Sequence, residues 1–271
     1  MGKNLVCLFW SLSVAVVATI ACADDSSLSV SDESVNQTEF AVDTSVFVAD
    51  KKTPEIRTRT VFVGARAYDV VGTSNGSVAC FDFDTQVVFL VDRTNRIRTS
   101  LPFEHLLRFQ SQLAARLQKR EGLGAFLAQP KFIREFDGTE NTIKLSSPWM
   151  SYVAQGNEAP SDQVELFTDF ADWSARLSSL LSPTAPPARA RLELNRALKR
   201  RNWQVTSVTR SGGPRAVSLG TVRSEHTYRR PLSNADNNLT KAVEKDLKQF
   251  EEVSFSDFRT KQNSRRVAAK Q

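Results

Sequence analysis

Residues 72–76 match the G-x-S-x-G pattern, which in α/β-hydrolases presents a nucleophilic serine on a sharp turn between a strand and a helix. The pattern makes Ser74 the candidate nucleophile of a secreted hydrolase. Residues 77–83 are typical of a strand, however, and Asn75-Gly76 is a strong signal for a two-residue hairpin turn because both residues tolerate a positive φ. We therefore expect a hairpin here, and a hydrolase that uses Ser74 is an alternative.

Pairs of carboxylates are the second feature that could do chemistry. Asp82 and Asp84 are spaced to lie on one face of a strand, an arrangement that suits an acid–base pair or a metal ion. With 30 Asp and Glu in the chain, pairs at this spacing arise readily by chance, and two more occur later in the sequence. Asp82 and Asp84 therefore stand as the second form of the hydrolase alternative.

Histidine and cysteine are too scarce for most metal chemistry. The chain has only His105, His226, Cys7, Cys22 and Cys80, which leaves few ligands for a zinc site. It also has no P-loop, no dinucleotide fingerprint, no EF-hand loop and no H-E-x-x-H motif. We therefore predict no catalytic residue, no metal site and no cofactor, and we interpret both histidines as surface or hydrogen-bonded residues.

The clearest charge feature is a basic region between Pro186 and Arg230, with two acids among eleven basic residues. Arginine clusters of this kind attract phosphates and carboxylates. Its helical part contributes Arg189, Arg196, Arg200 and Arg201, which we predict to bind an anionic ligand. The alternative is a solvated face that pairs with the acidic segment 162–172. The eleven are Arg189, Arg191, Arg196, Lys199, Arg200, Arg201, Arg210, Arg215, Arg223, Arg229 and Arg230.

The N-terminus predicts export. Lys3 precedes an apolar stretch from Leu5 to Ile20, and small residues at 21 and 23 supply a cleavage site, so residues 1–23 are typical of a signal peptide. Residues 19–22 are also similar to a bacterial lipobox, which makes Cys22 a candidate for lipidation. We expect an exported protein, periplasmic or extracellular, with lipid anchoring through Cys22 as an alternative to simple cleavage, and with no transmembrane span. The basic pI of about 9.4 then favours envelope partners over nucleic acid.

The remaining chain is predicted to form one domain with polar flanks. Residues 24–56 are rich in acids and are predicted to form a disordered linker. Residues 259–271 are predicted to form a basic disordered tail. Between them, residues 57–258 predict a single α+β domain. Its sheet is expected to be a curved antiparallel meander of about nine strands, half-barrel-like and packed with about four helices.

The expected elements follow from apolar periodicity and turn residues. Helices are expected between Ser100 and Gly122 and over 162–181, 188–201 and 233–250. Strands are expected over 60–71, 78–83, 87–91, 96–100, 132–136, 143–147, 149–154, 203–209 and 217–227.

Two stretches carry a resemblance to known proteins. Residues 170–177, with Pro186-Pro187 and residues 192–195, are similar to a set of uncharacterised secreted bacterial proteins. Residues 81–92, followed by 93–98, resemble consecutive meander strands of exported sheet proteins, including the periplasmic lipoprotein-carrier superfamily. The latter resemblance implies an unclosed half-barrel that is covered by helices and holds acyl chains. No functional residue of that superfamily can be assigned to a position of this chain.

These observations lead us to expect an exported, non-enzymatic protein that binds an apolar or anionic ligand of the cell envelope, such as a lipid or an anionic glycan. One alternative is the secreted hydrolase described above. The other is an interaction module whose arginine-rich helix docks an acidic envelope protein.

Overall fold

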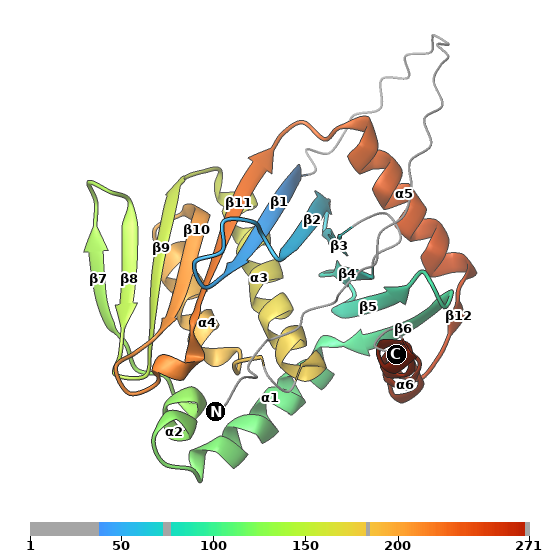
Figure 1. The fold of residues 1–271 in the computed structure, drawn as a ribbon. Coiled ribbons are helices and arrows are strands. Elements are labelled where there is room, and N and C mark those ends of the chain that lie inside the picture. Colours follow the sequence, from blue (N-terminus) through green and yellow to red (C-terminus); the bar gives the residue numbers. More distant parts are fainter. Residues whose placement is uncertain (1–37, 73–76, 183–184, 269–271) are drawn as a thin grey trace.

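An open sheet of twelve strands forms the frame of the molecule (Figure 1). The computed structural model describes residues 38–72, 77–182 and 185–268, with side chains as far as residue 262. Within them, six α-helices accompany the sheet, so the fold is α+β, as predicted. The strand order is β12-β6-β5-β4-β3-β2-β1-β11-β10-β9-β8-β7, and only the β12–β6 pair is parallel.

The first half of the sheet is an antiparallel meander in chain order. Gly64, with a φ of 57°, makes the turn that splits the expected strand 60–71 into two paired strands. The bounds are β1 Glu39–Val48, β2 Ile56–Val63, β3 Arg66–Val71, β4 Val78–Asp82, β5 Val87–Asp92 and β6 Ile97–Pro102.

The second half alternates helices with strands. The last long strand, β11, returns to pair with β1 and so joins the two halves of the sheet. The bounds are α1 Phe103–Gln118, α2 Leu123–Ala128, β7 Ile133–Asp137, β8 Thr142–Ser146, β9 Met150–Glu158, α3 Ser161–Leu181, α4 Arg189–Lys199, β10 Trp203–Gly212, a 3-10 turn Val217–Leu219, β11 Thr221–Arg229, α5 Asn234–Gln249, β12 Glu251–Glu252 and α6 Phe255–Ala268.

Helices α1 to α4 cover one face of the sheet, which we call the helix-covered face. Its core is aromatic: Phe170 of α3 meets the rings of Phe62 and Phe81 edge-on, with centroids 5.5 and 5.3 Å apart. Phe40 of β1 stacks on Phe62 at 4.2 Å. These buried rings supply much of the apolar area that drives folding.

Helix α5 covers part of the opposite face, which we call the α5 face. Val243 is fully buried there against Tyr68, Val70 and Cys80. A capping box between Ser233 and Asp236 fixes the start of the helix. Burial raises the pKa of the Cys80 thiol to about 12, so this cysteine is an inert core residue, in line with its place in an apolar strand.

The expected linker over residues 24–56 is wrong from Glu39 onward. β1 lies in the middle of the sheet, where Phe40, Ala41 and Val42 are fully buried. The acidic residues of this strand suggested a linker because their side chains alternate with the buried ones and point away from the helix-covered face. Asp43, for example, points to the α5 face and forms ion pairs with Arg59 and Arg229.

The expected disordered tail from Arg259 is also wrong, because helix α6 runs on to Ala268. Phe258 anchors this helix and is 1% exposed in the core of the helix-covered face. The structure therefore has more elements than predicted. The three additional strands are β1, β12 and the second strand of the split segment, and the two additional helices are α2 and α6.

Candidate functional site

Of the predicted hydrolase residues, the structure describes only the acid pair. Ser74 lies outside the described residues, as does the candidate lipidation site Cys22. β4 ends at Asp82, so Asp84 belongs to the following turn and does not share a strand face with it. Asp82 forms an ion pair with Arg66 at 2.7 Å and accepts a hydrogen bond from the Thr85 backbone N–H. These contacts lower its pKa against the effect of burial, which describes a structural carboxylate.

The four predicted arginines all lie at the exposed surface, on α4 or just after it. Arg189 donates to the carbonyl oxygen of Ala128, and Arg196 forms an ion pair with Glu193. Arg201 stacks over the ring of Phe136 at 3.6 Å, a cation–π contact. Three of the four thus have an interaction partner within the chain.

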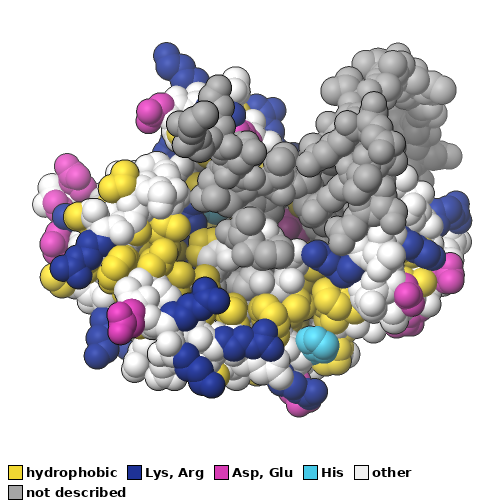
Figure 2. All heavy atoms as spheres, turned by 60° about the horizontal axis from the view of Figure 1, so that its bottom comes forward, with side chains coloured by type: hydrophobic (Ala, Val, Ile, Leu, Met, Phe, Trp, Pro, Cys, Tyr) yellow, Lys and Arg dark blue, Asp and Glu magenta, His cyan; other side chains and the backbone are white. Residues whose placement is uncertain are grey.

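Acidic side chains of helix α3 neutralise part of the positive charge of the basic region. Lys199 of α4 forms ion pairs with Glu165 at 2.9 Å and Asp169 at 3.5 Å. This matches the alternative in which the basic region pairs with segment 162–172. Seen from the end of the molecule where α1 and α2 lie, Lys and Arg side chains are scattered among hydrophobic ones (Figure 2).

Arg191 behaves differently from the other arginines of α4, because it turns toward the sheet. It lies one and two turns before Leu194 and Leu198, which are buried against the strands. Its Nε donates to Oδ1 of Asn195 at 2.9 Å, and Asn195 in turn donates to Asp172 of α3 at 2.7 Å. Asp172 also faces Arg176 at 3.6 Å. Arg191 therefore reaches a carboxylate only through an intervening amide.

The strands beneath α4 present polar side chains to Arg191. Tyr152 of β9 and Arg210 of β10 are directly opposite each other in the sheet register. Arg210 makes one long contact, 3.4 Å, to the carbonyl oxygen of Leu219, while its buried Nε has no hydrogen-bond partner among the described residues. Burial raises the pKa of Tyr152, whose hydroxyl therefore stays protonated.

β11 completes the group with His226 and Tyr228. His226 contacts the hydroxyls of Thr44 at 3.0 Å and Ser224 at 3.1 Å. Burial and the charge of Arg191 lower its pKa to about 3, so the ring is neutral at physiological pH. The buried hydroxyl of Tyr228 has no hydrogen-bond partner among the described residues, and its ring packs on Phe167 with centroids 5.4 Å apart.

We call this group the arginine site. Its members lie on α4 and on the strands of the helix-covered face; Tyr152 and Asn195 are buried and the others are partly buried. The members are Tyr152, Arg191, Asn195, Arg210, His226 and Tyr228.

The arginine site has more positive than negative charge. Arg191 and Arg210 belong to it, and no carboxylate of the described residues lies within ion-pair distance of either guanidinium. The nearest acid, Asp172, is already shared with Arg176, and burial raises its pKa. Burial also lowers the pKa of Arg191. A desolvated guanidinium without a carboxylate is costly, so the arrangement suits an incoming anion.

Ser224 and His226 form a serine–histidine contact, but their surroundings do not favour nucleophilic catalysis. In a catalytic triad a carboxylate behind the imidazole stabilises the imidazolium. Here the second ring nitrogen meets the Thr44 hydroxyl, and the neighbouring charge is the cation of Arg191. A ring with a pKa of about 3 is a poor proton acceptor, so His226 acts as a neutral hydrogen-bonding group.

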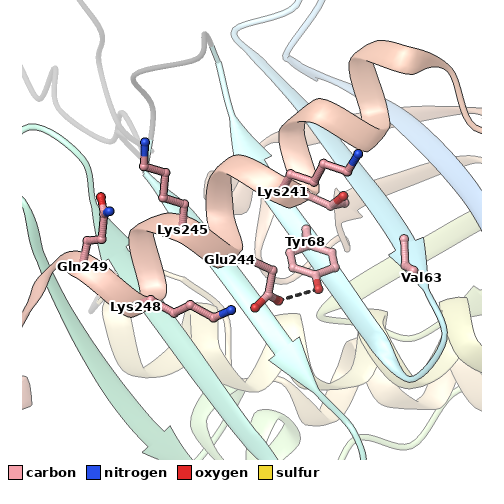
Figure 3. Close-up of a pocket in the computed structure, with 8 residues that line it drawn as sticks. Val63, Tyr68, Lys241, Glu244, Lys245, Lys248 and Gln249 are labelled. Carbon is pink, nitrogen blue, oxygen red and sulfur yellow. Dashed lines mark hydrogen bonds between the residues drawn. The ribbon is translucent and has the colours of Figure 1, made fainter.

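A separate groove of about 360 Å³ lies on the other side of the sheet, between α5 and the strands β2 and β3 (Figure 3). Glu244 of α5 turns toward the strands and accepts hydrogen bonds from Tyr68 and Arg66, each at 2.7 Å. Lysines from successive turns of α5 border the groove. Its lining residues are Val63, Tyr68, Thr240, Lys241, Glu244, Lys245, Lys248 and Gln249.

The described residues contain no group of three or more His, Cys, Asp or Glu that could hold a metal ion. In the same part of the chain, no helix combines the length and apolarity that crossing a membrane requires.

Sequence reasoning included Arg191, Arg210 and His226 in a basic region but did not bring them together. One signal was available, because Arg191 shares the helical stripe of Leu194 and Leu198, the residues expected to face inward. The partners on β9, β10 and β11 could not be found this way, since they depend on strand pairings that the sequence pattern leaves open.

Comparison with known proteins does not assign this chain to a family. No protein-family model matches the chain, and no curated protein matches it. The resemblances to secreted bacterial proteins and to lipoprotein carriers therefore stay predictions.

Proposed function

We propose that the protein is an exported, non-enzymatic binding protein that holds an anionic group of a cell-envelope ligand at the arginine site. The observation that carries this proposal is Arg191, a partly buried guanidinium that donates to Asn195 and has no carboxylate partner within ion-pair distance among the described residues. The expectation of export rests on residues 1–23 of the sequence. A lipid phosphate or the acidic group of a glycan would supply the missing charge.

The neighbouring groups are suited to an anion. A phosphate or carboxylate near Arg191 could accept hydrogen bonds from the hydroxyl of Tyr228, which lacks a described partner, and from the Nε of Arg210. Charge-assisted bonds of this kind are about twice as strong as neutral ones. A bound anion would therefore satisfy buried polar atoms and balance the charge in one step.

The resemblance to lipoprotein carriers would place an acyl chain between sheet and helices. In this chain, Phe167 and Phe170 of α3 pack directly on Phe62 in that space, with centroids 6.2 and 5.5 Å away. Our proposal therefore concerns the anionic group of the ligand, and it requires no acyl tunnel through the aromatic core.

Replacing Arg191 with methionine tests the proposal, with Arg196→Met as the matched control on the exposed side of α4. Without ligand, Arg191→Met should raise the free energy of unfolding by about 1–3 kcal/mol, because it removes an uncompensated buried charge. Inorganic phosphate, titrated during urea unfolding, should stabilise the wild-type protein and the control but not Arg191→Met. At 100 times its Kd it would add about 2.7 kcal/mol.

Two results would contradict the proposal. One is equal stabilisation of Arg191→Met and the wild-type protein by phosphate. The other is a loss of stability in ligand-free Arg191→Met, which would assign Arg191 a structural role through Asn195.

A second candidate function is the docking of an acidic envelope protein by α4. The observation in its favour is that Arg189, Arg196 and Arg200 follow one exposed stripe of the helix, at spacings of seven and four residues. It predicts a salt-sensitive pull-down of envelope proteins that is lost when these arginines become glutamines. Retention of the same partners by that variant would argue against docking by α4.

A further inference from the structure

The groove under α5 is the second positively charged feature of the molecule, and it lies on the face opposite the arginine site. Lys241, Lys245 and Lys248 follow one stripe of the helix and are exposed (Figure 3). None of the three forms an ion pair with a carboxylate of the described residues.

The one carboxylate among the residues that line the groove is already engaged. Glu244 faces Arg66 at 2.7 Å and accepts the hydroxyl proton of Tyr68 in a 2.7 Å hydrogen bond. It is therefore not available to neutralise the lysines. Three cations around a groove with an apolar floor at Val63 suit a segment that combines acidic and small apolar side chains.

A segment of that composition enters the fold beside the groove. In the register of the sheet, Glu39 at the start of β1 is paired with Val63, which lines the groove. The preceding residues 24–37 contain four acids and no Lys or Arg, together with Leu28, Val30 and Val35. The acids are Asp24, Asp25, Asp32 and Glu33.

We propose that the acidic segment 24–37 of this chain docks in the lysine groove between α5 and strands β2 and β3. Glu33 lies five positions before Thr38, and an extended chain of five residue steps spans about 17 Å. This reach lets Asp32 and Glu33 approach the nearest lysines while β1 stays in the sheet. The docking would place an intramolecular partner on α5, independent of the ligand proposed for the arginine site.

Zero-length carbodiimide cross-linking of the full chain, as purified from the producing cell, tests this docking. We expect cross-links within one chain from Asp32 or Glu33 to Lys241, Lys245 or Lys248. Their yield should fall at least fivefold in 1 M NaCl, because salt screens exposed charges. The control lysines are Lys119, directly after α1, and Lys131, shortly before β7, neither of which lines the groove.

Hydrogen exchange provides a second readout that does not depend on cross-linking chemistry. Amides of residues 24–37 should exchange severalfold faster in a K241Q/K245Q/K248Q variant than in the wild-type protein, while K119Q leaves them unchanged. The three lysines are exposed, so the variant should fold.

Several outcomes would overturn the docking. Cross-links spread equally over Lys119 and Lys131 would show that the segment has no preferred site. Cross-links found only between two chains would assign the groove to a second copy. A co-purified anionic molecule that protects the lysines, with no cross-link to segment 24–37, would assign it to an external ligand.

Discussion

At the residue scale, Asp69 is the carboxyl group whose ionisation most directly affects the fold. It lies on the helix-covered face, where the Thr60 hydroxyl donates to it at 2.8 Å. Burial raises its pKa to about 6, and the threonine hydrogen bonds oppose that shift only in part. The folded protein therefore holds the Asp69 proton more tightly than the unfolded chain, in which an Asp has a pKa near 3.9.

The first prediction follows from this linkage. The stabilisation by protonated Asp69 is complete below about pH 4 and is lost as the pH rises through about 6. Asp69→Asn removes the titration, so at pH 7.5 it should be more stable than the wild-type protein by up to about 3 kcal/mol. At pH 4 the two proteins should be nearly equal. Urea unfolding at both pH values measures the difference, and an unchanged gap between the proteins would contradict the assignment.

A second prediction concerns Asp236, which is 1% exposed at the start of α5. Burial would raise its pKa, but hydrogen bonds from Ser233 and the charges of Arg229 and Arg59 outweigh it, so the pKa is lowered. Its stabilising contribution is therefore present above about pH 4 and is lost as the pH falls below that value.

Asp236→Asn should cost about 2 kcal/mol at pH 7, because it weakens the capping box and the charge network. The cost should shrink toward pH 3, where the wild-type carboxyl group becomes protonated. Urea unfolding of both proteins over this range measures it. Asn237→Asp, at the next and exposed position, is the control, and a cost that does not change with pH would argue against the network.

Arg191 shows what the sequence revealed about single residues and what it did not. Composition placed eleven basic residues between Pro186 and Arg230, and the arginines of this helix were expected to point outward. The spacing of Arg191 to Leu194 and Leu198 was the one signal against this for Arg191, and the prediction did not use it. The absence of a described carboxylate beside it depends on which strands pass under the helix. That information is not contained in the local pattern, and the prediction named the exposed arginines 189, 196, 200 and 201, whose ligand binding stays a prediction.

At the scale of elements, α3 is held to the sheet by its aromatic stripe, and this gives a third prediction. Phe170 packs against Phe62 and Phe81, so Phe170→Ala should lower the free energy of unfolding by about 3–5 kcal/mol. Leu107→Ala, at a position of α1 that is 45% exposed, should change it by no more than about 0.5 kcal/mol. Urea unfolding measures both, and similar costs would mean that α3 does not form the core.

The helices that carry a clear apolar stripe were predicted within a few residues, because their periodicity extends over three or more turns. α3 was expected over 162–181 and spans Ser161–Leu181, and α4 was expected over 188–201 and spans Arg189–Lys199. β1 was missed because its acids, Glu39 and Asp43, resembled linker composition. The charge of Asp43 is balanced by Arg59 and Arg229 on the neighbouring strands, which only the strand pairing reveals.

At the scale of the whole molecule, β1 connects the two halves of the sheet, since it pairs with β2 on one side and β11 on the other. This position gives a fourth prediction. Val42→Pro removes a backbone donor from this central strand and should abolish cooperative unfolding. Ile133→Pro on the edge strand β7, a residue that is 70% exposed, should leave a cooperative transition. Thermal unfolding followed by circular dichroism measures both, and a cooperative transition in Val42→Pro would contradict the central role of β1.

The α+β class and the antiparallel meander of β4 to β6 were predictable, because short strands joined by tight turns pair with their chain neighbours. The return of β11 to β1 was not, since the two strands are far apart in the sequence and no local signal specifies their pairing. This long-range pairing places His226 and Tyr228 opposite β1 and so builds one side of the arginine site.

Native mass spectrometry can decide whether Arg191 holds the anionic group of an envelope ligand. Wild-type protein, Arg191→Met and Arg196→Met would be purified in parallel from the producing cell and sprayed without denaturation. We predict that the wild-type protein and Arg196→Met retain the same anionic molecule and that Arg191→Met is found without it. Identical masses of bound material on all three proteins, or no bound anion on the wild-type protein, would contradict the claim.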